Sequence, residues 1–207
     1  MNKRVLVVGG AGYVGGVLTN LLLEKGYEVR VYDALLYEQV VEDSTNLIVG
    51  DVRDREQLRP QLAWCDVVIW LAAVVGDAAC DLNPAITREV NDDAVAWLAT
   101  TFHGRIIFPS TSMVYGVQSG VLTESALIQP VSLYAQTKWT AEQNLEGANA
   151  LIVRLGTLFG YAGSRIRFDL VVNLLTMKAV TEQKIPINGG AQVRAFLHVF
   201  DVATVMA

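Results

Sequence analysis

The residues best suited to chemistry are a tyrosine and a lysine four positions apart, Tyr134 and Lys138, in the stretch YAQTK. Residues at this spacing lie on one face of a helix, a turn from each other. An ammonium near a phenol favours the phenolate and lowers the phenol's pKa from about 10. The pair can therefore provide a tyrosine base near neutral pH. The spacing alone is weak evidence, because chance produces it in roughly one such chain in six.

Three hydroxyl side chains, Ser110, Thr111 and Ser112, follow the apolar run at 105–109 (RIIFP), which we expect to be a strand. Ligands sit at the carboxyl ends of parallel strands in open α/β sheets. A hydroxyl there can align a reacting oxygen with a tyrosine base, or it can merely satisfy the local turn. The residue chemistry leaves all three hydroxyls open as candidates.

A glycine-rich turn directly follows the apolar run Arg4–Val8 and carries Gly9, Gly12 and Gly15 at GxxGxxG spacing. Glycines allow a tight turn that brings backbone N–H groups against a pyrophosphate. We expect a helix after the turn, up to about Gly26, and its positive end would face the same anion. A purely structural turn is the alternative. The position between a strand and a helix favours a dinucleotide loop.

An acidic residue, Asp33, follows the second expected strand, 18 residues after Gly15. A carboxylate at this place can accept both hydrogen bonds from an adenosine ribose diol, and it would repel a 2′-phosphate. The alternative is a solvated loop aspartate. With the glycine turn, Asp33 predicts NAD rather than NADP.

Elements that position these residues alternate along the chain. Besides the first strand and helix, we expect strands at 28–32, 46–49, 66–71, 105–109 and 150–154, and helices at 55–62, 84–101, 134–145 and 168–180. This order predicts an α/β fold with a doubly wound parallel sheet, a Rossmann fold.

The alternation weakens after residue 156. We expect residues 1–156 to form the dinucleotide-binding domain with the catalytic residues, and residues 157–207 to begin a small substrate-binding lobe interleaved with it. The final stretch, 201–207, resembles the opening of a helix capped by Asp201. We therefore expect the natural chain to continue past Ala207 and the lobe to be incomplete.

Composition narrows the function classes. The formal net charge of −5 and scattered basic residues do not suit a nucleic-acid partner. Two cysteines, Cys65 and Cys80, make neither a disulfide framework nor a metal site, and two histidines add no hydrolase triad. The longest apolar stretch, Val67–Val75, is too short to span a membrane. We expect a cytoplasmic enzyme that binds no metal, nucleic acid or membrane.

Taken together, these features resemble the extended short-chain dehydrogenase/reductase family, especially its nucleotide-sugar epimerase branch. The resemblance covers nearly the whole chain, and its motifs, weak singly, are specific jointly. In family order, the matching stretches are GGAGYVG (9–15), YDAL (32–35), GDVRD (50–54), LAAVVGD (71–77), VN (90–91), PSTSMVYG (109–116), YAQTK (134–138), RLGTLFG (154–160) and RAFLHVFDVA (194–203).

The resemblance implies roles for individual residues. Tyr134 would be the general base, Lys138 its pKa-lowering partner and a ribose ligand, and Thr111 the substrate aligner. Asp51 and Val52 would line the adenine pocket. The residues expected to bind the cofactor are Gly9, Gly12, Tyr13, Val14, Gly15, Asp33, Asp51, Val52, Leu71, Ala72, Ala73, Asn91, Tyr134 and Lys138. Those expected to bind substrate are Thr111, Ser112, Asn173 and Arg194, the last two at its diphosphate.

Two departures from the family pattern restrict the reaction. Ser112 and Met113 stand where the sugar dehydratases carry an Asp–Glu pair, which disfavours water elimination. Gly156 and Thr157 stand where the best-known galactose epimerases have Phe–Asn, which argues against a simple glucose/galactose epimerase.

Three functions follow as hypotheses. The first is an NAD-dependent epimerase that oxidises a nucleotide-diphosphate sugar to a keto-sugar and returns the hydride to the opposite face. The second is a net reductase or dehydrogenase of a keto-sugar or related carbonyl compound. The third is a non-catalytic dinucleotide sensor. The resemblance also implies a homodimer formed by the two long helices that carry Trp97 and Trp139.

Overall fold

A six-stranded parallel sheet forms the centre of the computed structural model, which describes residues 3–36, 46–163, 166–187 and 189–207. The strand order is β3-β2-β1-β4-β5-β6, and every neighbouring pair is parallel. The strands are β1 (Arg4–Val8), β2 (Glu28–Asp33), β3 (Asn46–Val49), β4 (Val67–Trp70), β5 (Arg105–Thr111) and β6 (Ala150–Leu155). The predicted doubly wound sheet is confirmed, with its order reversing between β1 and β4.

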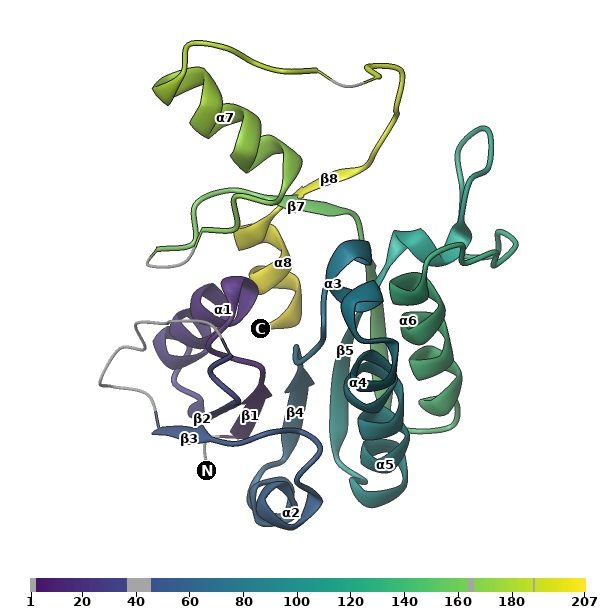
Figure 1. Ribbon diagram of the computed structural model, residues 1–207. Coiled ribbons are helices and arrows are strands. Elements are labelled where there is room, and N and C mark those ends of the chain that lie inside the picture. Colours follow the sequence, from purple (N-terminus) through teal and green to yellow (C-terminus); the bar gives the residue numbers. More distant parts are fainter. Residues whose placement is uncertain (1–2, 37–45, 164–165, 188) are drawn as a thin grey trace.

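Helices cover both faces of the sheet, as Figure 1 shows. They include α1 (Tyr13–Glu24), α2 (Arg55–Trp64), α3 (Asp77–Leu82), α4 (Pro84–Arg88), α5 (Ala94–Thr101) and α6 (Leu133–Asn144). Alternate residues of β1 point to opposite faces, so Leu6 and Val8 join a core with α2, α5 and α6, whereas Val5 and Val7 join a core with α1. This burial on both faces explains why β1 reads as an unbroken apolar run.

The predicted long helix at 84–101 is helical throughout, but it is not a uniform α-helix. It consists of α4, a π-helical segment η1 (Glu89–Asp93) and α5. The π-helical turn includes Asn91, whose side chain is buried. The short helix α3 and a 3-10 helix η2 (Ser112–Tyr115) were not predicted, because four to six residues show too little periodicity.

The C-terminal part forms a second, two-stranded parallel sheet from β7 (Thr157–Phe159) and β8 (Phe196–His198). Helix α7 (Val171–Thr181) lies above it, and α8 (Val199–Met206) returns to pack against α1. The prediction that Asp201 caps α8 is wrong. The cap is His198, whose Nδ1 accepts the N–H of Phe200 at 3.3 Å, while Asp201 lies in the first turn. No helix in the described ranges is long and apolar enough to cross a membrane.

Candidate active site

The glycine turn between β1 and α1 has a geometry that only glycine allows. Gly9 has φ +80°, and a Cβ there would lie closer than 3.0 Å to the backbone of Ala72 at the end of β4. A Cβ on Gly15 would overlap the backbone of Gly10. Gly12 is the N-cap of α1, so no side chain caps the first N–H groups of this helix. The first turn also carries no acidic residue. This positive helix end is therefore able to accept an anion such as the phosphate of a dinucleotide.

Asp33 is tied to the glycine turn. Its Oδ2 accepts the N–H of Ala11 at 3.0 Å, and its Oδ1 accepts the N–H of Leu35 at 2.9 Å. A carboxylate has about four acceptor positions, so both oxygens keep capacity for a ribose diol. The side chain lies at the carboxyl end of β2, beside the predicted phosphate loop.

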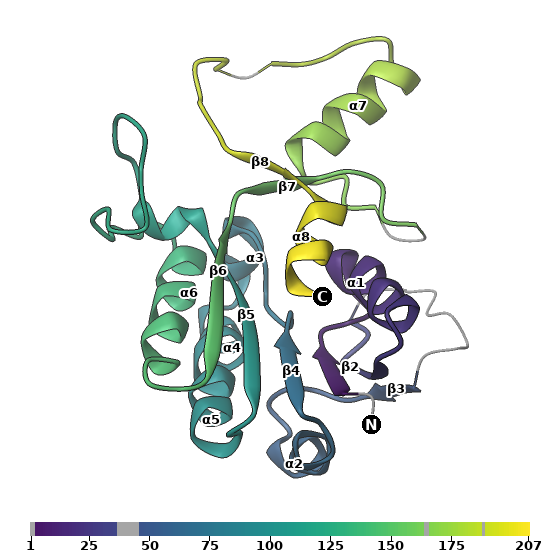
Figure 2. The same cartoon turned by 180° about the vertical axis from the view of Figure 1, so that it is seen from behind.

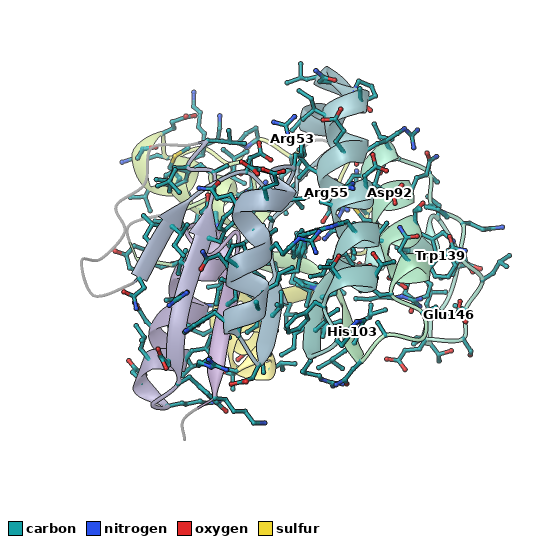
Figure 3. The ribbon with its side chains drawn as sticks, turned by 90° about the horizontal axis from the view of Figure 1, so that it is seen from below. Arg53, Arg55, Asp92, His103, Trp139 and Glu146 are labelled. Carbon is teal, nitrogen blue, oxygen red and sulfur yellow. The ribbon has the colours of Figure 1, made fainter. Side chains whose placement is uncertain are left out.

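Asp51 and Val52 follow β3. The Asp51 carboxylate is bound by Arg53, a residue to which the sequence analysis gave no role. Arg53 donates to both carboxylate oxygens of Asp51, with Nη2 to Oδ2 at 2.7 Å, and its Nη1 contacts Glu89 on η1 at 3.1 Å. These hydrogen bonds lower the pKa of Asp51. Val52 is buried against the core. Figure 3 labels Arg53, which links the loop after β3 to η1.

Leu71, Ala72 and Ala73 leave the end of β4 beside the glycine turn. The N–H groups of Leu71 and Ala72 donate to Val8 O at 2.7 and 2.9 Å. Asn91 fixes the same loop from η1: its Oδ1 accepts the N–H of Val74 at 2.8 Å, and its Nδ2 donates to Val74 O at 2.9 Å. Nδ2 also reaches the Thr137 hydroxyl on α6 at 3.3 Å. Asn91 thus connects the β4 loop to the helix that carries Tyr134.

The predicted tyrosine and lysine lie on α6, which Ser132 caps by accepting the N–H of Ala135. Lys138 is buried, donates to Pro109 O at 2.8 Å, and lies 4.4 Å from the centre of the Phe108 ring. This places the ammonium against the carboxyl end of β5.

The titration of the pair differs from the prediction. Burial lowers the pKa of Lys138 to about 8 and raises the pKa of Tyr134 to about 12. The expected effect of Lys138 on the tyrosine's pKa is not seen in the chain alone: burial is the largest influence, and the cation that lowers the Tyr134 pKa is Arg167.

The three candidate hydroxyls, Ser110, Thr111 and Ser112, differ in their hydrogen-bond partners. Ser110 donates its hydrogen to Glu142 on α6, so it is not free to donate to a substrate. The Thr111 oxygen accepts the N–H of Met113 at 3.2 Å as the N-cap of η2, which leaves its hydrogen available. Ser112 is half-buried in the first position of η2.

The predicted substrate residues of the C-terminal part lie in different settings. Asn173 is buried, accepts the N–H of Gly160 at 2.9 Å and donates to Arg167 O at 3.0 Å and to the Tyr13 hydroxyl at 3.3 Å. The Tyr13 hydroxyl donates to Gly160 O at 2.6 Å. Both side chains therefore join α1 to the segment between β7 and α7.

Arg194, by contrast, lines an open cavity of about 400 Å³ beside β8, which Asn173 does not line. The cavity is lined by Thr157, Asp169, Leu170, Val171, Gln192, Arg194 and Phe196.

Sequence reasoning missed the charged residues that support the site, namely Arg53, Glu142 and Arg154. Glu142 lies one turn after Lys138 on α6, a spacing that would have placed it on the same face. For Arg154 the only signal was a charge inside the apolar strand β6. Groups of three or more His, Cys, Asp or Glu side chains that could hold a metal were not found among the described residues.

The sheet order, the glycine turn and the tyrosine–lysine helix define a dinucleotide-binding protein of the short-chain dehydrogenase/reductase type. The model of the NAD dependent epimerase/dehydratase family matches residues 5–207, and the chain belongs to this family. The predicted family and its cofactor, NAD, are thereby confirmed.

Curated relatives catalyse different reactions. The chain is 34% identical over 154 residues to a UDP-glucose 4-epimerase of Rhizobium meliloti, covering 70% of this chain and 47% of that protein. It is 36% identical over 158 residues to a 3-beta-hydroxysteroid dehydrogenase of Mycolicibacterium neoaurum, covering 70% and 43%. The chain thus spans about half the length of these relatives.

A solved structure shows the same arrangement. The UDP-glucose 4-epimerase of Thermus thermophilus, in complex with NAD, superposes with a TM-score of 0.85 at 25% identity. The match covers 98% of this chain and 73% of that one.

Proposed function

We propose that this chain carries the cofactor-binding and proton-transfer residues of an NAD-dependent nucleotide-sugar epimerase that works through a keto-sugar intermediate. The observation that carries the proposal is the convergence of three elements at the carboxyl edge of the sheet. These are the glycine turn after β1, the hydroxyl of Thr111 at the end of β5, and the α6 face with Tyr134 and Lys138.

The residues present suit NAD. Backbone N–H groups of the glycine turn would hold its pyrophosphate, Asp33 its adenosine ribose, and Lys138 the ribose next to the nicotinamide. When bound, NAD supplies a reversible hydride acceptor whose oxidised ring is positively charged. That charge acts against the burial that raises the pKa of Tyr134.

The chain's own residues then handle the proton. Tyr134 accepts the proton of the sugar hydroxyl as the carbinol carbon loses its hydride, and it later returns that proton to the carbonyl oxygen. The Thr111 hydroxyl hydrogen-bonds the same oxygen and holds it in line. Hydride return to the opposite face of the keto-sugar inverts the carbon, so there is no net redox change.

A nucleotide-diphosphate sugar is the proposed substrate, since relatives of this family act on UDP-sugars. Arg194 is the residue in the cavity beside β8 best suited to a diphosphate, because its guanidinium can meet two phosphate oxygens. We assign the segment from residue 157 onward to substrate binding. Water elimination stays disfavoured by Ser112 and Met113.

Net oxidation or reduction of a carbonyl compound is the second candidate, and the relative named as a steroid dehydrogenase is the observation that favours it. Thr111, Tyr134 and Lys138 would serve that reaction unchanged. The third hypothesis, a dinucleotide sensor without catalysis, is less favoured, because binding alone does not require the buried ammonium of Lys138 on the helix that carries Tyr134.

The test is a panel of perdeuterated UDP-sugars incubated with purified protein and catalytic NAD, with products followed by mass spectrometry. An epimerase returns a product that retains every deuterium, with no accumulation of reduced NAD. Stoichiometric deuterium transfer to NAD selects the dehydrogenase instead. Equal turnover by Tyr134→Phe would reject both catalytic proposals.

We also propose a cytoplasmic homodimer formed through α5 and α6. Trp97 and Trp139 lie on these helices and are only half-buried. Trp97 is covered by the guanidinium groups of Arg55 and Arg59, and the Arg154 guanidinium lies 5.7 Å from the centre of the Trp139 ring, which Figure 3 labels. Light scattering should give twice the chain mass, and Trp139→Glu should give the monomer mass.

A further inference from the structure

A buried glutamate, Glu142, lies one turn after Lys138 on the same face of α6 and forms an ion pair with Arg154. The Glu142 side chain is only 5% exposed. Arg154 on β6 binds it with two nitrogens, Nη2 to Oε2 at 2.6 Å and Nε to both oxygens at 3.1 Å. Ser110 donates to the same carboxylate from β5, and Arg154 Nη1 donates to the Tyr115 hydroxyl at 2.8 Å. Figure 2 shows α6 lying beside β5 and β6.

These hydrogen bonds hold the Glu142 carboxylate in one position. Ser110 and Arg154 are direct partners across the parallel pair β5–β6, so the carboxylate is held from two neighbouring strands. Its own helix holds it from the third side. Charged groups are rarely buried unless paired, and three donors here satisfy both oxygens. The carboxylate therefore has a defined position relative to Lys138, one helical turn away.

Lys138 has few charged neighbours in the described part of the chain. The groups that act on its ammonium are Glu142 from its own helix and the Cys80 thiol from α3. From β5 it meets only the uncharged Pro109 carbonyl and the Phe108 ring. Cys80 remains a neutral thiol at ordinary pH, because burial raises its pKa to about 11. Among the described residues, Glu142 is thus the buried anion that acts on the buried ammonium: it lies one helical turn away on α6 and acts through space, without a direct ion pair.

We propose that Glu142 is a positioning residue of the active site: its clamped carboxylate, one helical turn from Lys138, is the through-space counter-charge that keeps the buried Lys138 cationic where it donates to Pro109 O. The inference rests on the role given to Lys138 in the proposed function. Arg154 then has the opposite influence, because it neutralises part of the charge that Lys138 experiences.

The test is a direct titration of Lys138 by NMR. The chain has five lysines, so [¹³Cε]lysine labelling gives few signals, and Lys138→Met identifies the one required. Glu142→Gln keeps an oxygen for Arg154 and Ser110 but removes the charge, and it should lower the pKa of Lys138 by about one unit. Arg154→Gln should raise the pKa of Lys138, since the carboxylate is no longer neutralised.

Glu146→Gln is the matched control, because it removes the same charge from an exposed position just after α6, labelled in Figure 3. It should leave the Lys138 titration unchanged. A structural role alone would not shift the two variants in opposite directions. An unchanged pKa in Glu142→Gln, or shifts of the same sign in Glu142→Gln and Arg154→Gln, overturns the proposal.

Folding is checked by the dispersion of the amide spectrum. If Arg154→Gln fails to fold, the comparison of Glu142→Gln with Glu146→Gln decides the question alone. The titration uses neither dinucleotide nor sugar. A protein that shows the predicted shifts but no epimerase activity would refute the proposed function and leave the counter-ion role intact.

Discussion

The glycine turn provides the most quantitative prediction, the effect of Gly9→Ala on stability. An alanine at φ +80° is left-handed, which costs about 1 kcal/mol. Its Cβ would also overlap the backbone of Ala72, which cannot move without disturbing the end of β4, at a cost of about 2 kcal/mol. The free energy of unfolding should therefore fall by roughly 3 kcal/mol, or about 9 °C in Tm for a chain of this size.

Two other glycines serve as controls in the same thermal unfolding assay. Gly26 has φ +81°, but a Cβ there meets nothing within 4 Å, so Gly26→Ala should lower Tm by only about 3 °C. Gly16 is exposed inside α1 and also has open space, so Gly16→Ala should raise stability by about 1 kcal/mol.

The order of the three variants tests the reasoning. Gly9→Ala should also abolish the thermal stabilisation that added NAD gives to the wild type, because the turn can no longer approach a pyrophosphate. If Gly9→Ala melts no lower than Gly26→Ala, the close approach to Ala72 does not constrain the turn, and this account of it is wrong.

Three further predictions concern the charged and polar residues. Tyr134→Phe should reduce turnover on the order of 10²–10⁴-fold and leave the Kd for NAD within about twofold, as calorimetry would show; an equal loss of affinity contradicts its role as a base. Asp33→Asn should narrow the preference for NAD over NADP by about tenfold, and an unchanged ratio of Kd values counts against the ribose assignment. Burial lowers the pKa of Lys138 from 10.5 in the unfolded chain to about 8 in the folded protein. Between pH 8 and 10.5 the unfolded state therefore binds one proton more than the native state, so the free energy of unfolding should rise with pH by up to roughly 3 kcal/mol. Urea titrations of wild type and Lys138→Met check this, and parallel curves contradict it.

Local patterns predicted the sheet well. The bounds of β1 and β3 match the expected strands, because buried apolar runs followed by turns are local signals. The glycine turn, Asp33 and the helix with Tyr134 were likewise visible, since each is defined within a few residues.

Features that depend on tertiary contacts could not be read in this way. The π-helical turn at Asn91 could not be predicted, because its residues have a composition like that of an ordinary α-helix. What distinguishes it is tertiary: the Asn91 side chain makes hydrogen bonds to Val74 and Thr137. The partnership of Ser110 and Glu142 spans 32 positions. The burial that raises the pKa of Tyr134 in the chain alone could not be predicted for the same reason, because burial is a property of the folded chain.

The central claim is that a dinucleotide on the glycine turn brings its nicotinamide to Tyr134 and Lys138. A crystal structure of the protein with NAD tests it most directly. We predict the pyrophosphate against the N–H groups at the start of α1 and the nicotinamide ribose within hydrogen-bond reach of Lys138 Nζ. A nicotinamide ring remote from both side chains, or a pyrophosphate bound elsewhere, would contradict the account.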